Sequence, residues 1–191
     1  MKLFVDRIES TPSDVRFEAA PDWWADRVKG DSVGFVMLKP PVFELKAHSM
    51  GRELLLAGHF EAEIEATCSR CLGRYRQPLR DDYRLVLEPA DGVEMPDPES
   101  AEALAREGIC LGEELEVGWY QGKELHLDRF FDEVVALALP QVPLCREDCP
   151  GLCPVCGASR STQTCDCNPI EPESPFAALA ALRLVGQDGE N

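Results

Sequence analysis

Apolar and polar residues alternate most clearly in the stretch His59-Phe60-Glu61-Ala62-Glu63-Ile64-Glu65-Ala66, which runs directly into Thr67-Cys68-Ser69-Arg70-Cys71. Side chains that alternate with a period of two point to opposite faces of a strand, so this stretch predicts a strand buried on one face. The Cys-x-x-Cys pair at its end predicts a turn that carries two thiols. A sheet is therefore expected, with one strand leading straight into candidate metal ligands.

Further extended runs lie on both sides of this stretch. Phe35–Leu38 and Val42–Leu45 precede it, the run Leu54–Ile64 contains part of it, and Tyr83–Leu87 follows it. The turn signals Ser49-Met50-Gly51 and Leu72-Gly73 separate the runs, which predicts an antiparallel meander, or a small barrel if the sheet closes. The expected fold class is α+β.

The second half of the chain predicts a hairpin and two helices. Leu115–Tyr120 and Glu124–Leu127 flank Gln121-Gly122, which indicates a hairpin. Asp128 is expected to cap a helix over Arg129–Leu139, whose apolar residues fall at helical spacing and should pack on the sheet. Ser174-Pro175 and the alanine- and leucine-rich residues 176–182 predict a short terminal helix.

The charge of the chain is strongly negative and unevenly placed. The 191 residues carry a net charge of −16, and residues 81–140 hold 16 acidic residues against four basic ones. Residues 88–114 are expected to form a mobile acidic connector with a short helix over Ser100–Glu107. We therefore expect a main domain over 1–144 and a cysteine-rich segment over 145–191 that packs on it.

The negative net charge and the lack of long apolar runs indicate the kind of partner and the location of the chain. Nucleic-acid binding needs clustered Lys and Arg, so general nucleic-acid binding is disfavoured and a basic protein partner is favoured. The N-terminal residues lack the apolar stretch of a secretory signal, and no apolar run approaches the roughly 18 to 20 residues that cross a bilayer. The chain is expected to be cytoplasmic, with no membrane partner.

Eight of the nine cysteines fall in two blocks. In a reducing cytosol such cysteines serve metals or catalysis more often than disulfides. Tetrahedral zinc takes four ligands, and a Cys-x-x-Cys turn lets two sulfurs face one cation. The favoured partition makes two Zn²⁺ sites, although a single site drawn from the last six cysteines is an alternative. The two sites would be Cys68, Cys71, Cys145 and Cys149, and Cys153, Cys156, Cys165 and Cys167.

Other uses of the cysteines stay open. The spacing Cys149-x3-Cys153-x2-Cys156 also occurs in iron–sulfur proteins, and Cys68-x-x-Cys71 also fits a thiol redox pair. Cys110 stands alone and is expected to be an ordinary cysteine. A closed set of four thiolates leaves no position for a substrate, and the sequence holds no phosphate loop or nucleophile–base motif. No enzymatic activity, catalytic residue or small-molecule substrate is expected.

Arginines gather around the first cysteine pair. Residues 68–80 carry Arg70, Arg74, Arg76 and Arg80 and no acid, which predicts a local positive patch. These arginines could offset the negative charge of a thiolate-bound zinc. Alternatively, Arg70, Arg74, Tyr75 and Arg76 are candidate RNA contacts, by phosphate pairing and base stacking.

The order of these motifs resembles the YceD family. The resemblance rests on Glu65-Ala-Thr-Cys68-Ser-Arg-Cys71-Leu, Glu133-Val-Val-Ala-Leu-Ala-Leu-Pro140-Gln-Val-Pro143-Leu-Cys145, Gly151-Leu-Cys153-Pro-Val-Cys156-Gly157 and Cys165-Asp-Cys167. It implies a non-enzymatic role in large-subunit ribosomal RNA accumulation, with ribosomal RNA precursor, a basic large-subunit ribosomal protein, or both as partner. Residues 158–163 depart from the Asn-Leu-Asn common in the family, which puts contacts made by those side chains in doubt.

Overall fold

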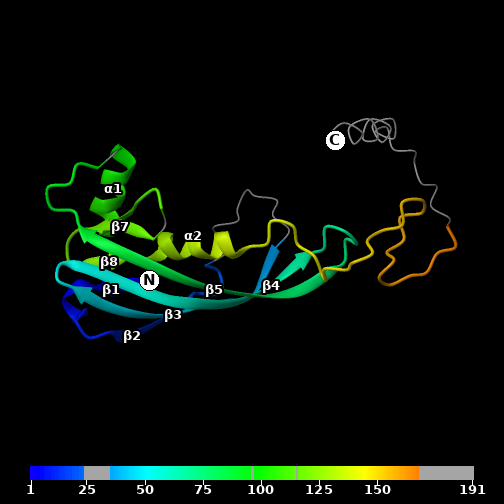
Figure 1. Cartoon of the computed structure of the whole chain (residues 1–191), viewed down its shortest axis with the longest axis horizontal. Helices are drawn as coiled ribbons and strands as arrows, with labels where there is room; N and C mark the ends of the chain where they lie inside the picture. The colour runs from blue at the N-terminus through cyan, green and yellow to red at the C-terminus, as the bar shows by residue number, and fades with distance from the viewer. Residues whose placement is uncertain (24–34, 96, 115, 168–191) are drawn as a thin grey trace, which may run out of the picture. The chain divides into compact units, whose positions relative to one another are not determined.

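The structure, a computed structural model, describes residues 1–23, 35–95, 97–114 and 116–167 (Figure 1). Two helices, one short 3-10 helix and eight strands make up its regular elements. In chain order they are β1 (Lys2–Phe4), η1 (Val5–Arg7), β2 (Ser13–Glu18), β3 (Phe35–Met50), β4 (Glu53–Thr67), β5 (Arg74–Pro89), α1 (Pro98–Glu107), β6 (Ile109–Leu111), β7 (Val117–Tyr120), β8 (Glu124–His126) and α2 (Asp128–Ala138).

The main sheet is built on the three long strands β3, β4 and β5. They pair antiparallel in sequence order, so the predicted meander is confirmed. The full order is β2-β3-β4-β5-β7-β6, in which β7 runs parallel to β5, so the six-stranded sheet is mixed. No pairing joins β2 to β6 in the part of the chain that the structure describes, and the barrel alternative is not shown.

Strand β3 is one long strand and not two short ones. Phe35–Leu38 and Val42–Leu45 both belong to it, and register shifts between Met37 and Val42 interrupt its pairing with β4. The break in the sequence pattern at Pro40-Pro41 therefore marks irregular pairing within a strand, which is where prolines are tolerated in sheets. The chain turns between β3 and β4 at Gly51, whose φ of 71° lies in the left-handed region that favours glycine.

The predicted hairpin over residues 115–127 is wrong. Strand β7 pairs with β5 and β6, whereas β8 pairs antiparallel with β1 at the start of the chain. Leu125 of β8 is fully buried opposite Leu3 of β1. Burial of this long-range pair outweighs the local turn preference of Gln121-Gly122, since sheet pairing follows the packing of side chains.

Residues 88–114 hold more structure than a solvated connector would. Helix α1 covers the segment in which a short helix was expected, and β6 follows it in the sheet. Leu104 of the helix and Ile109 of the strand are buried. A few apolar side chains therefore fix this segment to the sheet, although 9 of its 27 residues are acidic and all of these except Glu107 are exposed.

Helix α1 begins at a side-chain cap. The Asp97 carboxylate accepts a hydrogen bond from the Ser100 amide at 2.8 Å, and this bond holds the pKa of Asp97 below its usual value. A lowered folded-state pKa stabilises the helix above the unfolded pKa, and the contribution is lost as the pH falls through the folded pKa. Asp97→Ala should therefore speed amide exchange in the first turn of α1 roughly fivefold at neutral pH.

The pH dependence provides the control for this prediction. Asparagine caps helices without titrating, so Asp97→Asn should keep most of the protection at every pH. The difference between wild type and Asp97→Ala should vanish in acid, where the wild-type carboxylate is protonated. An Asp97→Ala variant that differs equally from wild type at neutral and acid pH would contradict the capping role.

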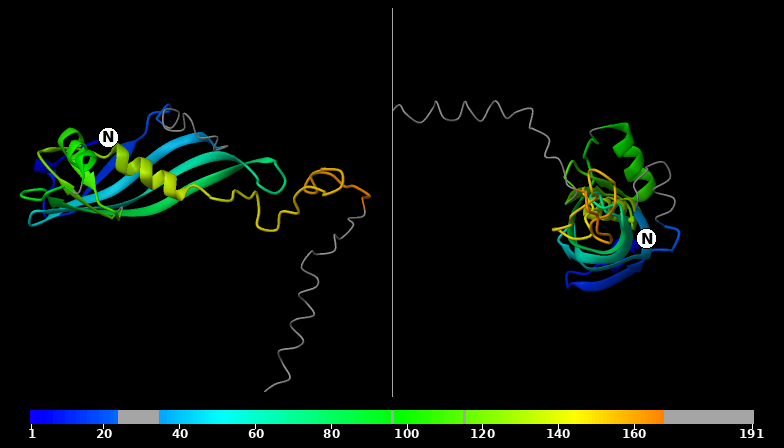
Figure 2. Two further views of the ribbon diagram at one scale, coloured as in Figure 1. Left: turned by 90° about the horizontal axis from the view of Figure 1, so that it is seen from above. Right: turned by 90° about the vertical axis from the view of Figure 1, so that its right-hand side faces the viewer.

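The core lies between α2 and one face of the long strands (Figure 2). Phe130, Phe131, Val134 and Val135 are buried, which confirms the predicted apolar face. The Phe131 ring stacks on Phe43 of β3 with 4.0 Å between ring centroids. The predicted cap is wrong, because the cap position is Leu127. Asp128 is instead the first helical residue, and its carboxylate pairs with the Met1 ammonium group.

The chain divides into two compact units. One comprises Met1–Ser69 with Gly73–Glu147, and the other comprises Arg70–Leu72 with Asp148–Asn191. Residues 139–167, all described, form no helix or strand beyond one bridge between Leu152 and Ser159. The predicted terminal helix over 176–182 lies outside the described residues. No helix in the described ranges is long and apolar enough to cross a bilayer.

Candidate metal centres

The structure groups eight cysteines into two tetrads. We call Cys68, Cys71, Cys145 and Cys149 the first tetrad, and Cys153, Cys156, Cys165 and Cys167 the second tetrad. Within each, all sulfur atoms lie within 4.8 Å of one another. This is the partition that the sequence favoured, and it leaves the alternative of one site drawn from the last six cysteines without geometric support.

The spacing of the sulfurs fits a tetrahedral ion. Zinc–sulfur bonds of about 2.3 Å place the four sulfurs of a tetrahedral site about 3.8 Å apart. Sulfurs already within 4.8 Å of one another need to move only slightly to reach that distance. Four soft thiolates are the donor set that zinc prefers, so the residues fit this metal.

The turn between β4 and β5 positions Cys68 and Cys71. The Cys68 amide donates to the Gly73 carbonyl at 2.9 Å and closes the turn. Leu72 inside it has a φ of 58°, a left-handed conformation rare for leucine, and its side chain is exposed. Both thiols are buried even so. The strand pairing thus supports a tight turn that holds two sulfurs away from water.

A short hairpin, residues 151–160, positions the first half of the second tetrad. The Cys153 amide donates to the Ala158 carbonyl at 2.8 Å, and the Arg160 amide donates to the Gly151 carbonyl at 2.9 Å. Gly151 and Gly157 have φ of 72° and 73°, so glycine permits the backbone to turn at both places. Backbone hydrogen bonds therefore order this loop without a helix or an extended strand.

Backbone amides in this loop point toward a sulfur. The amides of Cys156 and Val155 donate to the Cys153 sulfur and lower the pKa of this thiol to about 6. The hydrogen bond with Cys153 raises the pKa of Cys165, and the one with Cys156 raises the pKa of Cys167. A cation that binds here must displace the remaining thiol protons, so its affinity falls as the pH falls.

The ninth cysteine belongs to neither tetrad. Cys110 lies buried in β6, and its thiol donates to the Leu111 carbonyl at 3.5 Å. It is therefore a small buried residue, which is consistent with the ordinary cysteine expected from the sequence.

The arginines of β5 do not form a positive patch, contrary to the sequence prediction. Glu61, Glu63 and Glu65 of β4 lie on the same outer face of the sheet, across from these arginines. Arg74 pairs with Glu65 at 3.0 Å, Arg76 lies 3.9 Å from Glu63, and Arg80 pairs with Glu61 at 3.2 Å. The acids come from the neighbouring strand, so a count along the sequence does not include them.

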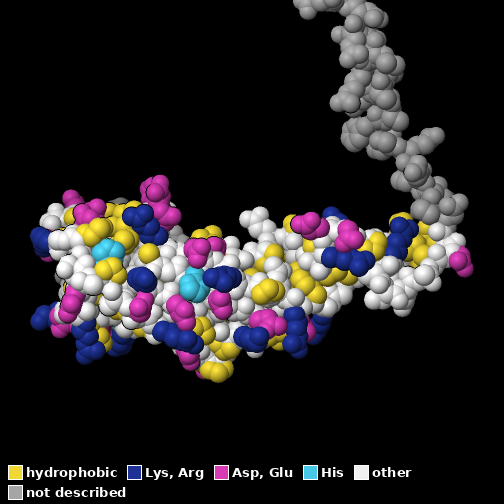
Figure 3. Space-filling model, turned by 60° about the horizontal axis from the view of Figure 1, so that its bottom comes forward, with side chains coloured by type: hydrophobic (Ala, Val, Ile, Leu, Met, Phe, Trp, Pro, Cys, Tyr) yellow, Lys and Arg dark blue, Asp and Glu magenta, His cyan; other side chains and the backbone are white. Residues whose placement is uncertain are grey.

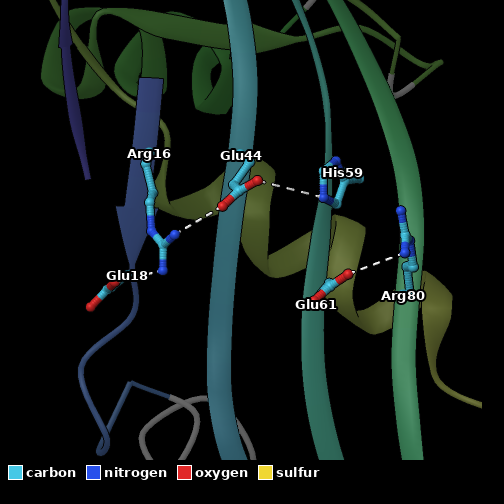
Figure 4. Close-up of polar contacts among 6 residues, drawn as sticks. All are labelled: Arg16, Glu18, Glu44, His59, Glu61 and Arg80. Carbon is cyan, nitrogen blue, oxygen red and sulfur yellow. Dashed lines mark hydrogen bonds and ion pairs between the residues drawn. The ribbon is translucent and has the colours of Figure 1, made fainter. Parts of the chain in front are cut away.

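Acidic and basic side chains also offset each other's charge elsewhere on this face of the sheet. Arg16 of β2 pairs with Glu44 of β3 at 2.9 Å, and His59 of β4 lies 3.8 Å from the other oxygen of Glu44. Figure 4 shows these side chains on the face of the sheet opposite α2. Figure 3 shows acidic and basic side chains intermixed over the face it draws. This surface therefore lacks the single sign of charge that attracts a phosphate backbone.

The other two candidate RNA contacts face different surroundings. Arg70 donates to the Cys149 carbonyl at 3.3 Å, so its guanidinium supports the backbone of a candidate ligand. The Tyr75 hydroxyl donates to Gln77 at 2.8 Å, and its ring packs partly against the core. Burial raises the pKa of Tyr75. Whether Arg70, Arg74, Tyr75 and Arg76 contact RNA stays a prediction.

Sequence reasoning missed two side chains that touch candidate ligands. Arg160 Nη2 lies 4.0 Å from the Cys153 sulfur, and Ser161 Oγ lies 3.7 Å from the Cys149 sulfur. Arg160 is the last residue of the hairpin and Ser161 follows it, in a stretch where the sequence showed only a departure from a family pattern. Their spacing from the cysteines in the sequence does not predict these contacts, because the contacts depend on the conformation of the backbone at the end of the hairpin.

Comparison with known proteins gives a family and several relatives. Uncharacterized proteins of Mycobacterium bovis and Mycobacterium tuberculosis are each 31% identical over 120 residues, which is 63% of this chain and 51% of the relative. An uncharacterized protein of Mycobacterium leprae is 28% identical over 120 residues, 49% of its length. The chain thus spans about half the length of the curated relatives it matches. No solved structure matches it.

The family match covers most of β4, all of β5 and both tetrads. A family described as large ribosomal RNA subunit accumulation protein YceD matches residues 56–183, which is more than half of the chain. The matched range contains all eight cysteines of the two tetrads. The chain therefore belongs to the YceD family.

Proposed function

We propose that this protein supports the accumulation of large-subunit ribosomal RNA as a non-enzymatic factor whose cysteine-rich segment is built around structural zinc. The observation that carries the proposal is the pair of four-sulfur clusters inside the region that matches the family. The family description supplies the biological role, and the clusters supply the physical device on which that role depends.

Zinc would act here as a scaffold. Four protein thiolates fill the coordination sphere of a tetrahedral ion, so no position is left for water or a substrate. Residues 139–167 form no helix or strand, and backbone hydrogen bonds order the loop 151–163 within them. Bound zinc supplies the remaining order by linking Cys153, Cys156, Cys165 and Cys167 through one ion.

The surface charges favour a basic protein as the direct partner over RNA. The net charge is −16, and the arginines on the outer face of the sheet are paired with glutamates. A basic large-subunit ribosomal protein would meet complementary charge, which speeds association. Ribosomal RNA precursor would meet a surface of mixed charge and bind more weakly.

The test of this function is the ratio of large- to small-subunit ribosomal RNA in cells that lack the protein. The ratio should fall and should be restored by the wild-type gene. A Cys153→Ser/Cys156→Ser variant should fail to restore it, because the second tetrad loses two of its four ligands. Cys110→Ala is the matched control, since this cysteine is buried outside both tetrads, and it should restore the ratio.

Three results would count against the proposal. An unchanged ratio in cells without the protein would remove the role in ribosomal RNA accumulation. Purified protein that contains iron and absorbs visible light would replace structural zinc with an iron–sulfur cluster. A pull-down of the tagged protein would then show whether any basic ribosomal protein binds, and capture of precursor RNA without such a protein would overturn the partner proposed here.

A further inference from the structure

One short hairpin connects the two tetrads. Cys149 belongs to the first tetrad and Cys153 to the second, and only Pro150, Gly151 and Leu152 separate them along the chain. A bridge between Leu152 and Ser159 joins the two arms of the hairpin. Cys153 and Cys156 lie in the hairpin and Cys149 lies two positions before its first residue, so a movement of the hairpin would disturb sulfurs of both tetrads.

Two adjacent residues at the end of the hairpin contact one sulfur of each tetrad. Arg160 Nη2 reaches the Cys153 sulfur at 4.0 Å, and the neighbouring Ser161 Oγ lies 3.7 Å from the Cys149 sulfur. The Arg160 amide bonds to the Gly151 carbonyl at 2.9 Å, and the amides of Thr162 and Gln163 bond to the Ser159 carbonyl at 3.1 and 2.8 Å. Two adjacent residues in a hydrogen-bonded turn thus contact sulfurs of different sites.

Charge makes these contacts stronger once metal is bound. A divalent ion with four thiolates leaves a net charge of −2 at each site. Arg160 is the only basic residue in the sequence between Pro150 and Cys167. A guanidinium beside a metal-bound sulfur offsets part of that charge, and a hydroxyl beside the other sulfur can donate a hydrogen bond to it.

We propose that Arg160 and Ser161 are positioning residues that couple the two sites, so that metal loads them cooperatively. Metal at either site fixes its own end of the hairpin, and the fixed hairpin then holds the adjacent donor against a sulfur of the other site. Coupling of this kind is reciprocal, because each site must favour the other by the same factor. The inference rests on the proposed metal binding and adds communication between the sites to it.

Titration of the reduced, metal-free, full-length protein with Co²⁺ tests the coupling, because cobalt–thiolate absorbance reports each filled site. Wild type should fill both sites in one cooperative step that ends at two ions per chain. Arg160→Gln and Ser161→Ala should each still bind two ions, but in separate steps, with the affinity of the affected site lowered about tenfold. Thr162→Ala is the matched control, since Thr162 bonds to a carbonyl and not to a sulfur.

The outcomes distinguish this inference from the proposed function. Wild-type sites that fill independently would overturn the coupling while leaving structural metal intact. Cooperative filling that survives both substitutions would remove Arg160 and Ser161 as its carriers. A wild type that binds fewer than two ions would overturn the two-site metal proposal together with the coupling. A ribosomal RNA ratio that does not respond to loss of the protein would touch the cellular role alone.

Discussion

A Cys153→Ser/Cys156→Ser variant is expected to bind one metal ion fewer per chain than wild type and to lose the order of residues 150–167. Structural zinc contributes about 10 to 16 kcal/mol in small peptide sites, which is comparable to the whole stability of a typical domain, about 5 to 15 kcal/mol. Two ligands cannot retain an ion that four hold. Metal analysis of the purified protein gives the stoichiometry, and amide hydrogen exchange gives the order of the segment.

The main sheet should survive this substitution. Met1–Ser69 and Gly73–Glu147 form a compact unit of their own, with a core of aromatic and aliphatic side chains. Slow amide exchange in β3, β4 and β5 should therefore persist in the variant, whereas residues 150–167 exchange fast. The matched variant Cys110→Ala should keep both ions. Unchanged stoichiometry in the double variant would mean that the second tetrad holds no metal.

The long strands and the cysteine groups could be predicted because their signals are local. Alternation along residues 59–66 fixes which face of β4 is buried, and that face holds Phe60 and Ile64 in the structure. Two cysteines separated by two residues in a turn, as in Cys153-x-x-Cys156, must lie close together whatever the fold of the rest of the chain. The partition into two tetrads followed from pairing such local units.

The errors concern contacts between segments that are distant in the sequence. The predicted hairpin at Gln121-Gly122 is wrong because β8 pairs with β1 and buries Leu125 opposite Leu3, more than a hundred residues away along the chain. The predicted positive patch is wrong because the pairing of β4 with β5 places Glu61 beside Arg80 and Glu65 beside Arg74. Secondary-structure propensity and charge counts consider one segment of the sequence at a time. Strand pairing brings in neighbouring residues from other segments, which such counts do not include.

The tetrads also contain features that the sequence predicts and features that it does not. The grouped cysteines could be found from residue type and spacing, but Arg160 and Ser161 could not. Arginine and serine are common in loops, and only the return of the hairpin brings them to sulfurs of different tetrads. Candidate metal ligands are thus easier to predict than the side chains that contact them.

Phe131→Ala is expected to lower the free energy of unfolding of the sheet-containing unit by about 3 to 5 kcal/mol. The Phe131 side chain is fully buried, and its ring contacts Phe17, Phe43, Tyr83 and Phe130, with centroids 4.0 to 5.8 Å away. Removal of the ring opens a cavity where α2 meets β2, β3 and β5, and closely packed neighbours fill it only partly.

Urea denaturation of the metal-loaded protein measures this loss, with near-ultraviolet circular dichroism following the aromatic core. Leu137→Ala is the matched control, because Leu137 lies on the same helix with 72% of its surface exposed, and it should change the free energy by less than about 0.5 kcal/mol. Because Phe131 is a member of neither tetrad, the Phe131→Ala protein should still bind two ions. A loss near that of Leu137→Ala would mean that α2 does not complete the core of the sheet.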